Sequence, residues 1–156
     1  PALAAALTQC PALARVDLSE NQLDADGTAQ VVEGLRARRV LSELDLSGNS
    51  LGRAGVEALA TVIVAHPELE GLRLRMIGLG DASALTLARA LKDLHALAEL
   101  DLSDNHIGNK GGVEIAQALD RCESRVMHVD LKGNNIGADV VLEHRMHMHH
   151  SMAIEF

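Results

Sequence analysis

The sequence contains no tryptophan or tyrosine, one phenylalanine, two cysteines and three prolines in 156 residues. Without aromatic side chains, the chain has no platform for stacking nucleic-acid bases and no aromatic-lined pocket. Two cysteines are too few for a disulfide scaffold, so we expect a reducing, intracellular setting. No apolar run reaches the roughly 18 residues that a transmembrane helix needs.

Basic residues are also scarce relative to acidic ones. The 14 Lys and Arg against 22 Asp and Glu leave a formal net charge of −8, which repels nucleic-acid phosphates and anionic membranes. Nucleotide-binding, zinc-hydrolase and serine-hydrolase motifs are missing. We therefore expect neither enzymatic activity nor a cofactor, and no nucleic-acid or membrane partner.

What the sequence does contain is a repeat. Segments such as LARVDLSENQL, LSELDLSGNSL and LAELDLSDNHI recur every 28 or 29 residues, and positions one, four, six and eleven of each are always Leu, Val or Ile. Such self-similarity identifies a repeat architecture. The repeats start at Leu13, Leu41, Leu69, Leu97 and Val126.

Each unit combines two periodicities. The alternation Leu44-Asp45-Leu46 predicts a short strand, and the spacing of Val56, Leu59 and Ile63 predicts a helix. A strand and a helix per unit predict an α/β solenoid. Because strands stack about 4.8 Å apart and helices need about 8–10 Å, the stack should bend into an arc with its parallel sheet on the concave side and helices on the convex side.

This pattern resembles the leucine-rich-repeat family, and the unit length resembles its ribonuclease-inhibitor-like subclass. The resemblance implies a protein–protein interaction scaffold. It leaves two alternatives open: a regulator of GTP hydrolysis similar to the Ran GTPase-activating proteins, and a structural segment of a longer horseshoe. Residues 1–141 form the repeat domain, with a partial repeat at 1–12, and residues 142–156 form a tail or an irregular cap.

The concave face is the expected binding surface of such a fold. Alternation places the third, fifth and seventh residues of each segment on it. The fifth residues form a central row of aspartates with an arginine in the middle, which is either an acidic patch for a partner with a basic surface or common strand filler. The candidate partner-binding residues are Asp17, Glu43, Asp45, Arg73, Arg75, Glu99, Asp101, His128 and Asp130.

The ninth position of each segment carries an asparagine, except in the third repeat. An Asn amide can both donate to and accept from the backbone that leaves the strand. Asn21, Asn49, Asn105 and Asn134 should have this role. Ile77 takes their place in the third repeat. We expect Ile77 to be buried, Met76 either to repack or to anchor a partner, and this turn to be rearranged.

Other motifs favour structural explanations. The run from Gln22 to Glu33 departs from a calcium-binding loop, and the histidines of residues 144–150 lack the spacing of a structural zinc site, so we expect no native metal. Cys10 and Cys122 lie in equivalent places four repeats apart, too far for a disulfide. Arg36, Arg38 and Arg39 either form a basic patch or offset a helix dipole.

Overall fold

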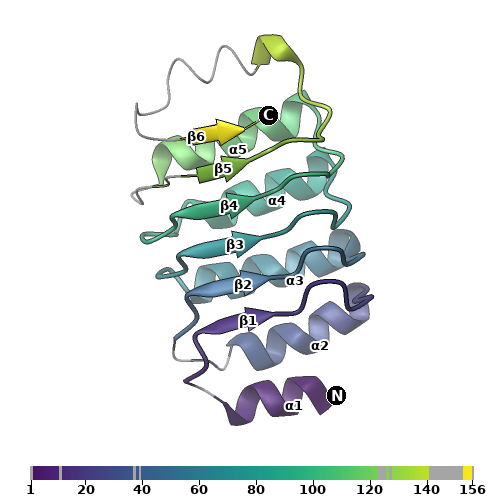
Figure 1. Cartoon of the computed structure of the whole chain (residues 1–156), viewed down its shortest axis with the longest axis vertical. Helices are drawn as coiled ribbons and strands as arrows, with labels where there is room; N and C mark the ends of the chain where they lie inside the picture. Colours follow the sequence, from purple (N-terminus) through teal and green to yellow (C-terminus); the bar gives the residue numbers. More distant parts are fainter. Residues whose placement is uncertain are drawn as a thin grey trace.

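The computed structural model describes residues 2–10, 12–36, 38, 40–122, 126, 128–140 and 153–155. Helices and strands alternate along the chain and form two layers, with the strands side by side and the helices behind them (Figure 1). The helices are α1 (Ala2–Gln9), α2 (Ala25–Arg36), α3 (Gly52–Ala65), α4 (Asp81–Leu91) and α5 (Asn109–Arg121).

The strands form a single parallel sheet in sequence order. They are β1 (Arg15–Asp17), β2 (Glu43–Asp45), β3 (Gly71–Arg73), β4 (Glu99–Asp101), β5 (His128–Asp130) and β6 (Ala153–Glu155). Each strand pairs with its neighbour one repeat away, so that Leu44 faces Leu72 and Leu72 faces Leu100. The predicted α/β solenoid is confirmed. Strand β6 comes from the segment predicted as a tail or cap, and the histidines at 144–150 lie outside the described residues.

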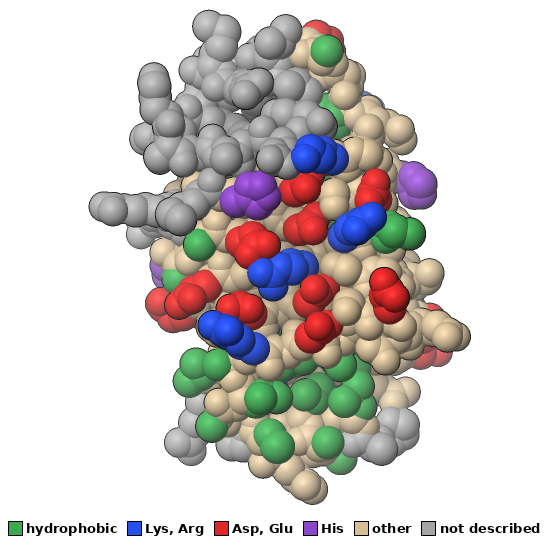
Figure 2. All heavy atoms as spheres, in the orientation of Figure 1, with side chains coloured by type: hydrophobic (Ala, Val, Ile, Leu, Met, Phe, Trp, Pro, Cys, Tyr) green, Lys and Arg blue, Asp and Glu red, His purple; other side chains and the backbone are tan. Residues whose placement is uncertain are grey.

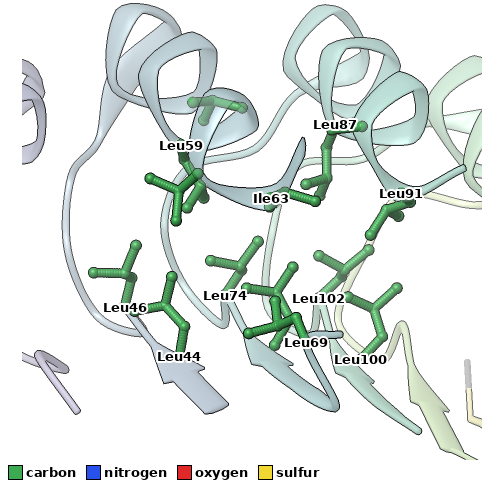
Figure 3. Packing of buried hydrophobic residues seen from close by; sticks show 14 of the residues in the cluster. Leu44, Leu46, Leu59, Ile63, Leu69, Leu74, Leu87, Leu91, Leu100 and Leu102 are labelled. Carbon is green, nitrogen blue, oxygen red and sulfur yellow. The ribbon is translucent and has the colours of Figure 1, made fainter. Parts of the chain in front are cut away.

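The core is a continuous spine of aliphatic side chains between the two layers. Leu44, Leu72 and Leu100 from the strands are fully buried, as are Leu59 and Ile63 from α3. Figure 3 shows leucines of successive rungs packed against one another and against the helices behind them. Because each rung covers the next, burial is most complete in the middle of the stack.

Asparagines connect the turns that follow the strands. Asn105 Oδ1 accepts hydrogen bonds from the backbone N–H groups of Ile77 and Leu79, at 3.1 and 3.0 Å, while Nδ2 donates to the carbonyls of Leu74 and Leu102. Asn49 repeats this arrangement two turns earlier, with the N–H groups of Asn21 and Leu23 as donors. Asn49 and Asn105 therefore each satisfy backbone groups of the preceding turn as well as of their own.

The third turn keeps the backbone of its neighbours at Met76 but differs from the second and fourth turns at Gly78, whose φ is 77°, whereas Ser50 and His106 at the equivalent place have no positive φ. Ile77 is buried, as expected, with 1% of its surface exposed, and Met76 is 57% exposed. Met76 has the same left-handed backbone (φ 54°) as Glu20 and Asp104 at the equivalent place. The N–H groups of Ile77 and Leu79 are nevertheless satisfied, because their acceptor is Asn105 in the next repeat and not the residue at position 77.

A second inter-repeat contact joins the beginnings of α4 and α5. Asp81 Oδ1 accepts from the N–H groups of Gly108 and Gly111, at 2.8 and 2.9 Å, and so caps the following helix. A Cβ on Gly111 would lie 2.8 Å from Asp81 Oδ1 and 2.9 Å from the Ala84 Cβ. The third residue of this helix is therefore glycine because the neighbouring repeat leaves no room for a side chain.

Replacing Gly111 by alanine should lower the free energy of unfolding by about 1–3 kcal/mol, because the methyl group must displace the Asp81 carboxylate. Gly80→Ala is the matched control, since a Cβ there meets nothing within 4 Å. Chemical denaturation of both variants measures the difference. Equal stability of the two would show that the α4–α5 contact can relax around the added methyl group.

Candidate functional site

The sheet face is the surface formed by the third, fifth and seventh residues of the repeated segments. Strand pairing aligns Asp17 with Asp45, Asp45 with Arg73, Arg73 with Asp101 and Asp101 with Asp130. A second row runs beside it from Arg15 through Glu43 and Glu99 to His128. Acidic and basic side chains are interspersed over this face (Figure 2). All of the candidate residues predicted from the sequence thus lie on one surface.

Arg73 is at the centre of an ion-pair network on the sheet face. Its Nε and Nη2 donate to the two carboxylate oxygens of Glu99, at 3.1 and 2.6 Å, in a bidentate pair. Glu43 lies between Arg73 Nη1, at 3.7 Å, and Arg15 Nε, at 3.1 Å. The hydrogen bond to Glu99 is the main cause of a raised pKa for Arg73. Although Arg73 stands between two aspartates in its row, its charge is neutralised by glutamates of the adjacent row.

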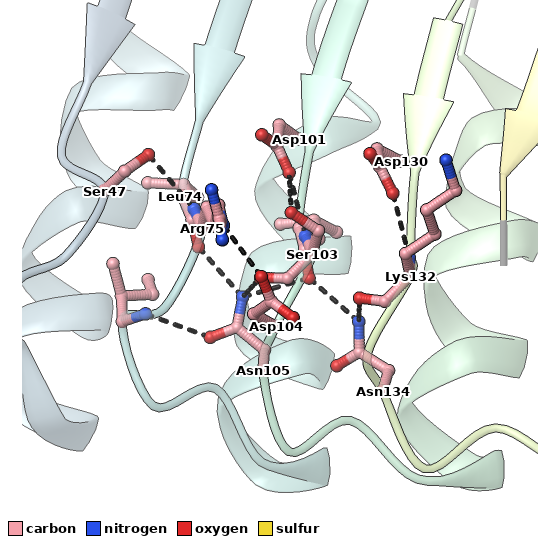
Figure 4. Close-up of polar contacts among 12 residues, drawn as sticks. Ser47, Leu74, Arg75, Asp101, Ser103, Asp104, Asn105, Asp130, Lys132 and Asn134 are labelled. Atoms are coloured by element: carbon pink, nitrogen blue, oxygen red, sulfur yellow. Dashed lines mark hydrogen bonds and ion pairs between the residues drawn. The ribbon is translucent and has the colours of Figure 1, made fainter.

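Arg75 has a partner that the sequence analysis missed. Its Nε donates to Asp104 Oδ2 at 2.7 Å, and this hydrogen bond raises the pKa of Arg75 (Figure 4). Asp104 is the eighth residue of its segment and has φ 52°, a conformation that aspartate tolerates better than most residues. That preference is the sequence signal by which Asp104 could have been assigned to the turn.

The aspartates of the central row have a structural role of their own. Oδ1 of Asp17, Asp45, Asp101 and Asp130 accepts a hydrogen bond, at 2.9 Å in each case, from the backbone N–H two residues later. Arg73 cannot accept such a bond, and the N–H of Arg75 donates instead to Ser47 Oγ at 3.2 Å. The aspartate at this position therefore helps to end the strand.

Hydrogen bonds within its turn make Asp17 more acidic than an ordinary aspartate. The backbone N–H and then the hydroxyl of Ser19 lower the pKa of Asp17. Because folding lowers this pKa, the ionised form stabilises the fold above the ordinary aspartate value near 3.9, and that contribution is lost as the pH falls through the lower folded value.

Within the described residues, the hydrogen bonds to the central aspartates go to Oδ1. The ion pairs found in the same part of the chain involve Arg15, Arg53, Arg73 and Arg75, paired with Glu43, Glu57, Glu99 and Asp104. Within the described residues, Oδ2 of these aspartates takes part in none of these hydrogen bonds or ion pairs. The sheet face combines internally neutralised arginines with a row of negative charge.

The remaining motifs have local explanations. Asp24 Oδ1 accepts from the N–H of Gly27 at 2.8 Å, so the calcium-loop-like run begins helix α2. Arg38 is buried, and its Nη1 donates to the carbonyls of Cys10 and Leu13, which removes it from any basic patch. Burial lowers its pKa. Arg39 lies outside the described residues.

Side chains that could bind metal do not cluster in the described part of the chain. No group of three or more His, Cys, Asp or Glu there could hold a metal ion. Cys10 and Cys122 are not joined in a disulfide, and Cys122 Sγ donates to the carbonyl of Leu94 at 2.9 Å. Within the same residues, no helix has the length and apolar character needed to cross a membrane.

Comparisons with known proteins agree with this geometry. The sequence pattern described as "Leucine Rich repeat" matches residues 39–60 and 95–116, which lie in the second and fourth complete repeats. Comparison with the curated proteins finds no match. Among solved structures, "Leiomodin-1 Actin-Binding Site 2 (ABS2)" is similar, with a TM-score of 0.72 at 19% identity over 93% of this chain and 82% of that one. Repeat, register and architecture together identify the chain as a solenoid of leucine-rich repeats.

Proposed function

We propose that the chain is a protein-interaction scaffold and that it binds a protein partner with a basic surface on its sheet face. The observation that carries this proposal is the division of charges on that face. Arg73 and Arg75 are neutralised by Glu99 and Asp104, whereas the central aspartates direct one oxygen to their own backbone and keep the other for a partner.

The spacing of the charges suits lysine or arginine side chains of a partner. Adjacent strands of a sheet lie about 4.8 Å apart, so Asp101 and Asp130 present two carboxylates close enough for one lysine or arginine side chain to contact both. Their mutual repulsion is relieved when a cation binds between them. A rigid sheet also loses little conformational entropy on binding.

The two arginines have different places in this proposal. The side chain of Arg73 is 33% exposed and held by Glu99 and Glu43, so it positions these carboxylates. The side chain of Arg75 is 54% exposed at the rim and is the better placed for direct contact. Exposed Met76 follows it and supplies an apolar contact beside the charge.

We also propose the ribonuclease-inhibitor-like subclass for the repeats, because each complete unit has 28 or 29 residues and its own helix. We propose an intracellular location as well, because the chain has only two cysteines and disulfide scaffolds are typical of secreted proteins. The structural similarity to an actin-binding segment is one of fold at 19% identity. The chemistry of the partner is therefore inferred from the charges on the sheet face.

Removing the charge without removing the strand cap tests the proposal. The double variant Asp45→Asn and Asp101→Asn keeps an oxygen for the N–H groups of Ser47 and Ser103, so the fold should be retained. In quantitative affinity capture, proteins bound by the wild type should be reduced at least about tenfold, since two charge-assisted contacts are lost.

The control is a second double variant that removes the same number of negative charges from the helices behind the sheet. Glu114→Gln with Asp120→Asn alters two exposed residues of α5 and should leave capture unchanged. Thermal melting of both double variants verifies that they fold equally well. Capture that falls to the same extent in the two variants, or in neither, would contradict binding through the sheet face.

A further inference from the structure

The helical side of the molecule carries a groove that the proposed function does not use. The side chains that α3 and α4 direct toward the sheet are the buried residues Leu59, Ile63, Leu87 and Leu91 (Figure 3). Other residues of these helices, together with the end of α2, line an open groove of about 510 Å³. That volume lies within the range of protein sites that accept ligands or side chains.

The floor of the groove is apolar. It contains Ala60, Ala65 and Ala90 with Val64, whose surface is 52% exposed. Thr61 and Thr86 also line it, but each hydroxyl donates to a carbonyl of its own helix, at 2.7 and 3.3 Å. Neither hydroxyl therefore has to be matched by an acceptor on a partner, and the groove favours an aliphatic side chain.

The charged residues that line the groove are both cations. Arg36 lies in the last turn of α2 and Arg89 in the last turn of α4, and both are exposed. Neither takes part in the ion pairs found within the described residues. The arginine guanidinium groups can therefore form bidentate pairs with carboxylates from outside the chain.

We propose that this groove binds an acidic amphipathic helix of a partner protein. Aliphatic residues on one side of that helix cover Val64 and the alanines, and flanking Glu or Asp residues pair with Arg36 and Arg89. Binding of an amphipathic helix in a groove is an established mode of peptide recognition. The proposal rests on charge complementarity with an acidic partner. The apolar floor is bordered by two arginines, although the net charge of the chain is −8.

The direct test uses two designed peptides. One is a fluorescein-labelled amphipathic helix of Leu, Ala and Glu, about four turns long, with Leu at every third or fourth position. The other has Lys in place of every Glu. Fluorescence anisotropy should show saturable binding of the Glu peptide, weakened by added salt, and no binding of the Lys peptide. Equal binding of both peptides, or binding of neither, would overturn the proposal.

Variants with matched controls locate the binding. Arg36→Glu with Arg89→Glu, and separately Val64→Asn, should each weaken binding of the Glu peptide at least about tenfold. Arg121→Glu changes another last-turn arginine, and Val40→Asn changes another exposed valine, 55% exposed; neither residue lines the groove, and neither change should alter the affinity. Groove variants that bind like their controls would overturn the proposal.

Two further measurements distinguish this proposal from binding at the sheet face and from self-association of the chain. Asp45→Asn with Asp101→Asn alters only the sheet face and should leave peptide binding intact, so either surface can fail without the other. Sedimentation of the wild type should show no self-association through the groove. Self-association through the groove would appear in the wild type and be abolished by Val64→Asn. In that case, the occupant is a second copy of this chain and the acidic-helix proposal is wrong.

Discussion

Asn105→Ala should lower the free energy of unfolding by about 4 kcal/mol. The side chain is 2% exposed and makes hydrogen bonds to five backbone groups: the N–H groups of Ile77 and Leu79 and the carbonyls of Leu74, Leu102 and Ser103. Each buried backbone group left without a partner costs about 1–3 kcal/mol, and partial relaxation recovers some of that sum. The loss therefore exceeds that of an ordinary surface substitution several-fold.

The same substitution in other repeats provides the controls. Asn21 is exposed, and its amide donates within its own turn, to the Ser19 carbonyl. Asn21→Ala should therefore cost less than about 1 kcal/mol. Asn134 is half-buried and should be intermediate. Urea unfolding measures the free energy of unfolding of each variant, and the m-values should be unchanged if the substitutions alter only stability. Equal losses at Asn21 and Asn105 would contradict the role of these asparagines in joining successive turns.

Leu69→Ala should lower the free energy of unfolding by about 3 kcal/mol. Leu69 is the first residue of the third segment and is fully buried in the middle of the stack. Its truncation removes apolar area from the core and leaves a cavity between rungs that are held on both sides, so the surroundings can collapse only partially. Losses of about 2–5 kcal/mol are typical of such sites.

Leu13→Ala is the matched control, because Leu13 is the first residue of the first complete segment. It is 47% exposed, and apolar side chains gather at the N-terminal end of the molecule, beyond the charged residues of the sheet face (Figure 2). Its truncation should cost below about 1.5 kcal/mol, in proportion to the smaller area withdrawn from water. A loss at Leu13 as large as that at Leu69 would show that burial in this stack does not depend on the position of the rung.

The third repeat shows what sequence reasoning could and could not resolve. A single segment indicates that Ile77 replaces an asparagine and should be buried, and both statements are correct. It does not indicate that the N–H group of Ile77 is satisfied by Asn105, 28 residues later. The partner of a backbone group lies in another repeat, so its identity depends on how the rungs are aligned.

The charged residues also show that the sequence indicates a position but not the partner of a side chain. Alternation places Arg73 in the central row, yet its long side chain pairs with Glu99 of the adjacent row. Arg38 occurs in a basic run, yet it is buried and donates to the carbonyls of Cys10 and Leu13, which lie 28 and 25 residues earlier in the chain. The groove at Arg36, Val64 and Arg89 is formed by three helices and has no signature in any one of them.

The sequence by itself determined the repeat, the strand and helix of each unit, the aliphatic spine and the face on which the candidate residues lie. These follow from periodicity, since the side-chain directions of a strand and a helix depend on local geometry. Only the tertiary structure decided which donors and acceptors meet and which charges are neutralised. Those outcomes depend on contacts between residues about 28 positions apart, and these residues come close together only when the repeats stack.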